Sequence, residues 1–176
     1  MIQWKRKNFT LRHQFIILVR SCTLDTLTAR PLQTQSQDLM VDGVEGMFCL
    51  MDADKFKSIN DNYGHDVGDK VIKAIAECLK KTFRNTDITM RLGGDEFAVY
   101  VVGVMNEING EFFIENFFEE IDAIKIPELG KRKITISLGA AFFNVEENLS
   151  FAEVYKRADS AAYESKKFTG NHYTFY

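Results

Sequence analysis

The order of apolar and polar residues predicts strands and helices that interleave along most of the chain. Residues 47–51 form an uninterrupted apolar run, which is typical of a strand buried on both faces. On either side of Gly93-Gly94, apolar and polar residues alternate, and this pattern predicts a β-hairpin with the two glycines at its turn. Apolar residues at helical spacing predict a helix from about Val67 to Phe83. The other expected elements are helices near 8–21, 32–40, 111–124 and 150–167, a turn at 25–31, and strands at 46–52, 87–92, 96–103, 133–143 and 172–176.

The predicted hairpin decides the expected fold class. A chain that strictly alternates strands and helices forms a parallel sheet, whereas an inserted hairpin brings in antiparallel pairs. We therefore expect an α/β (α+β) fold with a mixed central β-sheet flanked by helices. The 176 residues, 45% of them hydrophobic, are enough for one core. The expected organisation is a basic N-terminal segment or linker over residues 1–24 and one domain over residues 25–176.

Charge is distributed unevenly, and this bears on the partners of the protein. Residues 1–20 contain five basic side chains and no acidic one, although the whole chain has a net charge of −3. The basic segment is expected to pack on the domain or on a second subunit, and a contact between residues 1–20 and a membrane surface is the alternative. Because the rest of the chain is acidic, nucleic acid is not expected as a partner.

Two features of the sequence favour a cytoplasmic location. The three cysteines are an odd number, and Cys49 and Cys78 lie in apolar segments, as expected for free thiols in a reducing compartment. The longest apolar run near the start of the chain, residues 15–19, is too short for a signal peptide or a membrane-spanning helix.

Two acidic segments carry the candidate chemistry. Gly93 and Gly94 lack Cβ atoms and precede Asp95 and Glu96, so a ligand can approach the backbone while the carboxylates hold a cation. An isolated Gly-Gly-Asp-Glu sequence is more typical of a solvated turn. In the other segment, Asp52 directly follows the buried strand, where a carboxylate is costly unless it is paired or binds a metal.

Two common motifs do not fit the segment that begins at Asp52. A calcium-binding loop needs an oxygen ligand and a glycine where this chain has Phe56 and Lys57. A P-loop needs four residues between its glycines, but only three separate Gly64 from Gly68, and an acid follows in place of the lysine. The remaining interpretation is an acid-rich strand end followed by a glycine-punctuated loop that leads into a helix.

Taken together, residues 52–69 and 91–97 resemble the GGDEF domain family, the diguanylate cyclases of bacterial second-messenger signalling. The resemblance covers residues 25–171 and implies a fold like the catalytic palm of nucleotidyl cyclases and polymerases. It implies a nucleotidyltransferase that condenses two GTP into cyclic di-GMP with release of two pyrophosphates, using Mg²⁺ or Mn²⁺. Since one domain offers one GTP site and the product joins two GTP, catalysis implies a transient homodimer.

The resemblance also assigns roles around the two acidic segments. It implies that Asp52, the backbone carbonyl of Ala53 and Asp95 ligate the metal, with Glu96 as a further acidic ligand. It implies catalytic roles for Asp95, which accepts the proton of the attacking 3′-hydroxyl, and for Glu96. Lys57 matches the lysine that stabilises the phosphoryl transition state.

Four further positions match substrate-binding residues of the family, and they are Asn60, His65, Asp69 and Lys166. Asp69 can accept hydrogen bonds from the ring N–H and exocyclic amine of guanine, which adenine does not offer on one edge, so GTP is favoured over ATP. Lys166 can contact the triphosphate. Arg84 and Asp87 match the family's RxxD pattern, which implies an allosteric site for the product, cyclic di-GMP.

Departures from the family's pattern leave an alternative function open. The motif at the start of the domain keeps Asp25, Leu27 and Thr28 but lacks a following glycine, and Gly170 stands where a second cation is expected. Fewer positive groups around the phosphates would weaken GTP binding and lower turnover. The alternative is therefore a catalytically weak or inactive GGDEF module that binds GTP or cyclic di-GMP as a receptor or regulator.

Overall fold

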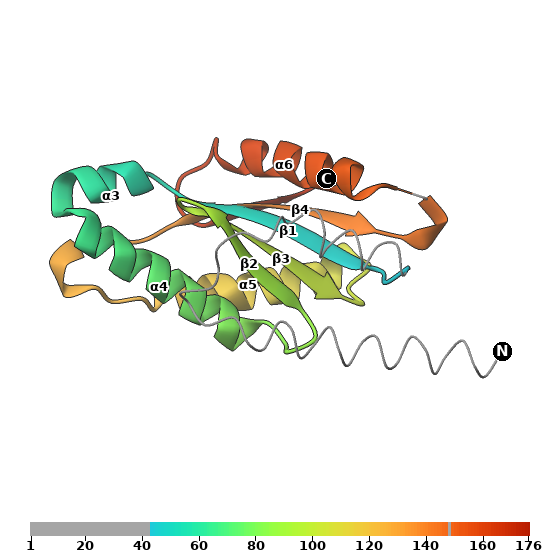
Figure 1. Cartoon of the computed structure of the whole chain (residues 1–176), viewed down its shortest axis with the longest axis horizontal. Helices are drawn as coiled ribbons and strands as arrows, with labels where there is room; N and C mark the ends of the chain where they lie inside the picture. The colour runs from blue at the N-terminus through green and yellow to red at the C-terminus, as the bar shows by residue number, and fades with distance from the viewer. Residues whose placement is uncertain (1–42, 148) are drawn as a thin grey trace.

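The computed structural model describes residues 43–147 and 149–176, which form a five-stranded sheet with helices on both faces (Figure 1). The expected elements near 8–21, 25–31 and 32–40, and the basic segment 1–24, lie outside the described residues. In chain order the elements are β1 (Gly46–Ala53), α3 (Phe56–Tyr63), α4 (His65–Thr82), β2 (Ile88–Gly93), β3 (Glu96–Val102), α5 (Glu107–Asp122), β4 (Ile136–Phe143), α6 (Phe151–Ser165) and β5 (His172–Phe175), with short 3-10 turns at Pro127–Leu129 and Val145–Glu147.

The sheet is mixed, as the inserted hairpin predicts. Its strand order is β2-β3-β1-β4-β5, with β1 in the centre. Among the described strands three of the pairings are antiparallel, and only β4 and β5 run parallel. The expected α/β (α+β) fold class with a mixed central sheet is therefore confirmed.

The central strand β1 is buried on both faces, which also confirms the interpretation of its apolar run. Its odd-numbered residues, such as Cys49, pack in one cluster with α4 and α5. Its even-numbered residues, such as Phe48 and Leu50, pack in a second cluster with α6. At Gly139 of β4 a Cβ atom would lie 2.1 Å from backbone atoms of α6, so only glycine permits this close helix–sheet contact. After Leu50, the next residue of β1 on the α6 face is Asp52. Its side chain lies beside the end of this helix.

The prediction of a loop that leads from Asp52 through Gly64 into a helix at residues 67–83 was wrong in one respect, because most of that loop is helical. Residues 56–63 form α3, and α4 already begins at His65. Phe56, Ile59 and Tyr63 recur at helical spacing, and Ile59 is buried. The segment is short and mostly polar, so its periodicity is too weak to predict a helix from the sequence. Gly64, with φ of 86°, separates the two helices.

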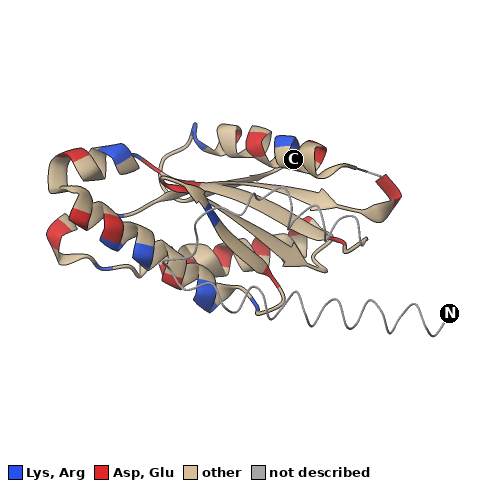
Figure 2. Ribbon diagram, viewed as in Figure 1, with Lys and Arg blue, Asp and Glu red and all other residues tan. Residues whose placement is uncertain are grey.

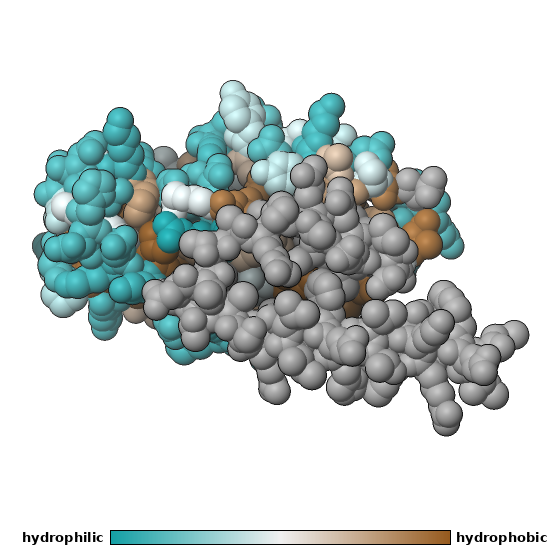
Figure 3. Space-filling view, viewed as in Figure 1, coloured by the Kyte–Doolittle hydropathy of each residue, from teal (hydrophilic) through white to brown (hydrophobic). Residues whose placement is uncertain are grey.

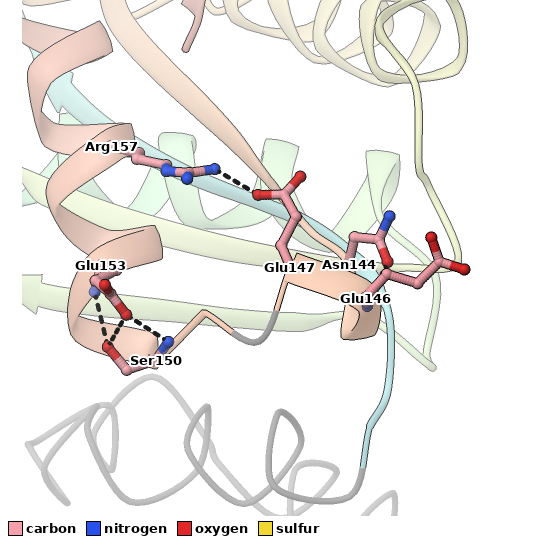
Figure 4. Close-up of polar contacts among 6 residues, drawn as sticks. All are labelled: Asn144, Glu146, Glu147, Ser150, Glu153 and Arg157. Atoms are coloured by element: carbon pink, nitrogen blue, oxygen red, sulfur yellow. Dashed lines mark hydrogen bonds and ion pairs between the residues drawn. The ribbon is translucent and has the colours of Figure 1, made fainter.

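Other boundaries shift by a few residues. Helix α5 starts at Glu107 rather than near 111, because the Asn106 side chain accepts a hydrogen bond from the Asn109 backbone N–H and caps the helix. Strand β4 begins at Ile136, three residues later than expected. Helix α6 begins after Ser150, whose hydroxyl and backbone N–H exchange hydrogen bonds with Glu153 in a capping box (Figure 4).

Charged side chains of both signs occur along α3 and α4 (Figure 2), and the surface around α3 is hydrophilic (Figure 3). In the part of the chain that the structure describes, no helix is both long and apolar enough to cross a lipid bilayer. Cys49 and Cys78 are buried free thiols, in agreement with their apolar sequence context.

Candidate active site

One end of the sheet brings the two acidic segments together. The end of β1, the β2–β3 turn, the start of α3 and the end of α6 all lie there (Figure 1). The backbone N–H of Ala53 donates to the carbonyl oxygen of Asp95 at 3.2 Å, so the hairpin turn is fastened to the end of the central strand. Asp52 and Asp95, which lie 43 positions apart in the sequence, are neighbours through this contact.

The hairpin turn lies one residue later than the sequence predicts. Gly93 is the last residue of β2, and the two turn residues are Gly94 and Asp95, with an irregularity in register between Arg91 and Gly93. Gly94 has φ of 53°, which favours glycine, and in the described part of the chain no atom beyond its two sequence neighbours lies within 4 Å of where its Cβ would be. The Arg91 guanidinium donates to the Gly94 carbonyl oxygen from Nε at 3.0 Å and from Nη2 at 2.6 Å. Arg91 therefore fixes the turn that carries Asp95.

Asp52 faces α6 and lies directly opposite Glu96 in the antiparallel pair of β1 and β3. Two carboxylates opposite one another repel unless a cation lies between or beside them. Here the cation is the Lys166 ammonium, whose Nζ lies 3.1 Å from Asp52 Oδ2. Burial raises the pKa of Asp52, the Lys166 partner lowers it, and the nearby carboxylates of Asp95 and Asp54 raise it further.

A cleft of about 520 Å³ opens on this side of the sheet. Asp52 and Glu96 line its floor from the strands, and α6 contributes Asp159, Tyr163 and the Lys166 that follows the helix. The carboxylates make the cleft acidic, and among the described residues that line it Lys166 is the only basic one. A cleft of this size and charge suits a ligand that arrives with its own cations.

The predicted guanine-binding residues lie on α3 and α4. A Cβ atom on Gly68 would lie 1.9 Å from Asn60 Oδ1, so the Asn60 side chain rests against the backbone one residue before Asp69. The close packing of α3 against α4 thus brings Asn60 and Asp69 near one another. His65 opens α4 and is exposed, and Lys57 lies on the exposed side of α3.

Arg84 and Asp87 lie at the other end of β2 from the Gly94 turn, and the six residues of that strand span roughly 20 Å. Arg84 is exposed, and its guanidinium stacks 4.7 Å from the centre of the Phe113 ring. Asp87 is only 3% exposed. Its Oδ2 accepts from the Arg84 backbone N–H at 2.8 Å and its Oδ1 from the Val102 backbone N–H at 3.1 Å. Both carboxylate oxygens of Asp87 thus support the fold locally.

The comparisons with known proteins bear on this site. A family model described as "Diguanylate cyclase, GGDEF domain" matches residues 26–172. The chain belongs to the GGDEF domain family. Its acidic cleft therefore lies in a GGDEF domain, between α6 and the strand residues Asp52 and Glu96.

Curated relatives carry names from the same family. The chain is 37% identical over 121 residues to the probable diguanylate cyclase DgcT of Escherichia coli, covering 67% of this chain and 26% of that protein. It is 38% identical over 127 residues to the diguanylate cyclase DgcP of Pseudomonas aeruginosa, covering 72% of this chain and 18% of that protein. It is 32% identical over 161 residues to an uncharacterized protein, YtrP, of Bacillus subtilis, covering 91% of this chain and 27% of that protein. The chain thus spans about a quarter of the length of such relatives.

Solved structures show the same fold. The GGDEF domain of DgcB from Caulobacter crescentus, in complex with c-di-GMP, superposes with a TM-score of 0.70 at 27% identity, covering 82% of this chain and 85% of that one. The diguanylate cyclase SiaD of Pseudomonas aeruginosa, in complex with its activator SiaC, has a TM-score of 0.75 at 21% identity, covering 98% of this chain and 68% of that one.

The residues around the GGDEF turn are chemically suited to a divalent metal. Carboxylate and carbonyl oxygens are the ligands that Mg²⁺ prefers, and the fastening of Ala53 to Asp95 places such groups side by side. Within the described ranges, no cluster of three or more His, Cys, Asp or Glu side chains is arranged to hold a metal by itself. A metal at Asp52 and Asp95 would therefore need oxygens from the backbone, the nucleotide or water.

Some supporting residues were missed by sequence reasoning. Thr135 Oγ1 donates to Asp54 Oδ2 at 2.6 Å, and Ser137 Oγ donates to Asp54 Oδ1 at 2.7 Å. These bonds hold the chain just beyond Asp52 against β4. The signal was present, because two hydroxyl residues flank Ile136 at the start of an otherwise apolar strand. Arg91 had a weaker signal, since a basic residue beside a glycine turn is common.

Proposed function

We propose that this GGDEF domain is a diguanylate cyclase that condenses two GTP into cyclic di-GMP with release of two pyrophosphates. The observation that supports the proposal most is the meeting of Asp52, the Asp95 turn and Lys166 at one end of the sheet. Phosphoryl transfer depends on charge-stabilising groups placed before the reaction. The carboxylate at the strand end, the glycine turn and the ammonium of the Lys166 side chain are such groups.

Mg²⁺ or Mn²⁺, when held by Asp52, the Ala53 carbonyl, Asp95 and Glu96, supplies positive charge to phosphate oxygens. In each half-reaction the 3′-oxygen of one GTP bonds to the α-phosphorus of the other, and the bond from that phosphorus to pyrophosphate breaks. Asp95 accepts the proton of the 3′-hydroxyl. Lys57 stabilises the charge that develops on the transferred phosphoryl group.

Guanine selection rests on Asn60 and Asp69. In this proposal the Asp69 carboxylate accepts from the ring N–H and amine of guanine, and the Asn60 amide supplies one donor and one acceptor. His65 and Lys166 complete the contacts to GTP. Support comes from the seating of Asn60 against Gly68, which holds the amide close to Asp69.

Assembly and feedback are part of the same proposal. Two GTP sites must face one another to close two equivalent bonds, so catalysis requires a transient homodimer related by a two-fold axis. Cyclic di-GMP is proposed to bind at Arg84 and Asp87, away from the Asp52 and Asp95 end of the sheet, and to inhibit. The contact of residues 1–20 with a membrane surface and the cytoplasmic location stay predictions.

A second candidate function is a weak or inactive module that binds GTP or cyclic di-GMP as a receptor. Two observations favour it. Of the cleft-lining residues that the structure describes, only Lys166 is basic, and it is already paired with Asp52. Gly170 stands at the position of the expected second cation. Nucleotide binding without turnover would result if the phosphates lacked enough positive charge.

Incubation of the purified chain with GTP and Mg²⁺, followed by nucleotide chromatography, separates the two functions. We expect cyclic di-GMP and pyrophosphate, with a rate per molecule that rises with protein concentration because the active form is a dimer. Binding of GTP without product would favour the receptor. A rate per molecule that stays constant over a hundredfold dilution would contradict the transient dimer.

Guanine selection is tested by thermal stability with non-reacting nucleotides. In Mg²⁺, saturating 3′-deoxy-GTP should raise the melting temperature by about 5 °C, whereas 3′-deoxy-ATP should not, because ligands that bind only the folded state stabilise it. Asp69→Asn should lose most of this shift. Asp66→Asn is the matched control, since Asp66 is an exposed acid in the first turn of the same helix. Equal shifts with the two nucleotides would remove Asp69 from base recognition.

A further inference from the structure

The position of Lys166 is set by the backbone, while its side chain is free to change partner. Lys166 follows directly after α6, and its backbone N–H donates to the Ala162 carbonyl oxygen at 3.0 Å. The preceding residue, Ser165, is buried, and its hydroxyl donates to the Leu138 carbonyl oxygen at 2.7 Å. This anchors the end of α6 to β4. The Lys166 side chain is 45% exposed, so its ammonium can move while its Cα stays in place.

The partner of this ammonium is a carboxylate that needs a cation. Asp52 is 22% exposed, lies opposite Glu96, and is close enough to Asp54 and Asp95 to be repelled by both. Within the described ranges Lys166 is the one basic side chain paired with it. A half-buried carboxylate among other carboxylates is costly without a counter-charge. Lys166 provides that charge at Asp52 Oδ2, on the carboxylate that is proposed to bind the metal.

We propose that Lys166 is an exchangeable counter-ion, which neutralises Asp52 when no metal is bound and moves to nucleotide phosphate oxygens when a divalent cation takes its place. This inference rests on the proposed function, because it assumes that Asp52 is a metal ligand. The exchange makes binding of a free metal ion less favourable than binding of a metal–nucleotide complex. A free metal ion must break the Lys166–Asp52 pair, and the displaced ammonium then has no new partner. A metal–nucleotide complex gives the displaced ammonium a new anionic partner.

Two opposite consequences distinguish this role from simple attraction of phosphates. Removing the Lys166 charge should strengthen the binding of a divalent cation alone, because the competitor for Asp52 is gone. The same change should weaken the binding of the nucleotide in the presence of metal. A lysine that only contacted phosphate would change the second affinity and leave the first unaltered.

The chain offers a matched control for the charge. Lys167 is the next residue, its side chain is 53% exposed, and its Nζ lies 2.7 Å from Glu164 Oε1. Glu164 lines the cleft but Lys167 does not, so Lys167→Met also unpairs a cleft carboxylate while leaving the Lys166–Asp52 pair in place. Lys166→Met and Lys167→Met remove the same charge one position apart, so general electrostatic effects on metal affinity should be similar in both.

The experiment is a titration of Mn²⁺ without nucleotide, with the free ion followed by electron paramagnetic resonance. Lys166→Met should bind Mn²⁺ about fivefold more tightly than the parent, the size expected for loss of a partly exposed ion pair. Lys167→Met should stay within about twofold of the parent, since exposed charges are screened by salt. With saturating Mn²⁺, Lys166→Met should bind 3′-deoxy-GTP, which cannot react, about fivefold more weakly.

Each outcome decides one point. Equal Mn²⁺ affinities of Lys166→Met and Lys167→Met would overturn the counter-ion role, even if Lys166 contacts phosphate. Tighter Mn²⁺ binding with unchanged 3′-deoxy-GTP binding would overturn the transfer to phosphate. Asp52→Asn separates the proposal from its foundation: if this variant binds Mn²⁺ as the parent does, the metal site of the proposed function is wrong. A melting temperature within a few degrees of the parent confirms that each variant is folded.

Discussion

Replacing Asp95 by asparagine is expected to abolish formation of cyclic di-GMP while leaving the fold intact. Asparagine is a poor ligand for Mg²⁺ and cannot accept the proton of the 3′-hydroxyl, and loss of a general base alone lowers rates by about 10²–10⁴-fold. The turn itself should survive, because its shape depends on Gly94, on the Arg91 guanidinium and on the bond from Ala53 to the Asp95 backbone carbonyl. None of these contacts uses the Asp95 carboxylate.

The stability of this variant provides a second readout. The Asp95 carboxylate repels Asp52 and contributes to the raised pKa of that group. Removal of one of the two charges should therefore keep or raise the melting temperature. Asp122→Asn is a matched control, because Asp122 ends α5 and its exposed ion pair with Lys133 at 3.2 Å contributes little to stability. Turnover of Asp95→Asn near that of Asp122→Asn would remove Asp95 from the mechanism.

The fold could be predicted from sequence mainly where burial of one face makes apolar residues recur at the spacing of a strand or a helix. The apolar run of β1, the alternation in β2 and β3, and the stripe on α4 each carry a signal that tertiary packing reinforces. The signal fails for α3, which is short and mostly polar, with one buried residue, Ile59. It also fails at the start of α5, where Gly110 lies inside the helix. A Cβ there would lie 2.8 Å from Met47 Sδ, so packing against β1 favours glycine over a better helix former.

The site could be predicted in its residues but not in its pairings. Asp52, Asp95 and Glu96 follow from the resemblance, and the structure places them around one strand end. That Lys166 pairs with Asp52 depends on how α6 packs over Gly139, a contact between distant segments that no local pattern encodes. The anchoring of Asp54 by Thr135 and Ser137 is non-local for the same reason.

Asp87→Ala is expected to lower the stability of the domain strongly, by about 2–4 kcal/mol, because the buried carboxylate of Asp87 accepts two charge-assisted hydrogen bonds from backbone N–H groups and both are lost. The Arg84 N–H before β2 and the Val102 N–H at the end of β3 would both lose their acceptor. For a chain of this size the melting temperature should fall by about 5–15 °C. Thermal denaturation followed by circular dichroism measures the change, with Asp122→Asn again as the control for loss of a carboxylate.

This expectation decides how the proposed product site can be tested. Burial raises the pKa of Asp87, and backbone N–H groups hold both of its oxygens, so loss of product binding in Asp87→Ala would follow from damage to the fold as well as from a missing contact. Arg84 is the cleaner probe. Its guanidinium is exposed and its stacking on Phe113 contributes about 0.5–1 kcal/mol, so Arg84→Ala should fold. That variant should resist inhibition by cyclic di-GMP at an unchanged initial rate. If Asp87→Ala instead melts like the parent, its carboxylate is dispensable for the fold and is available to bind the product directly.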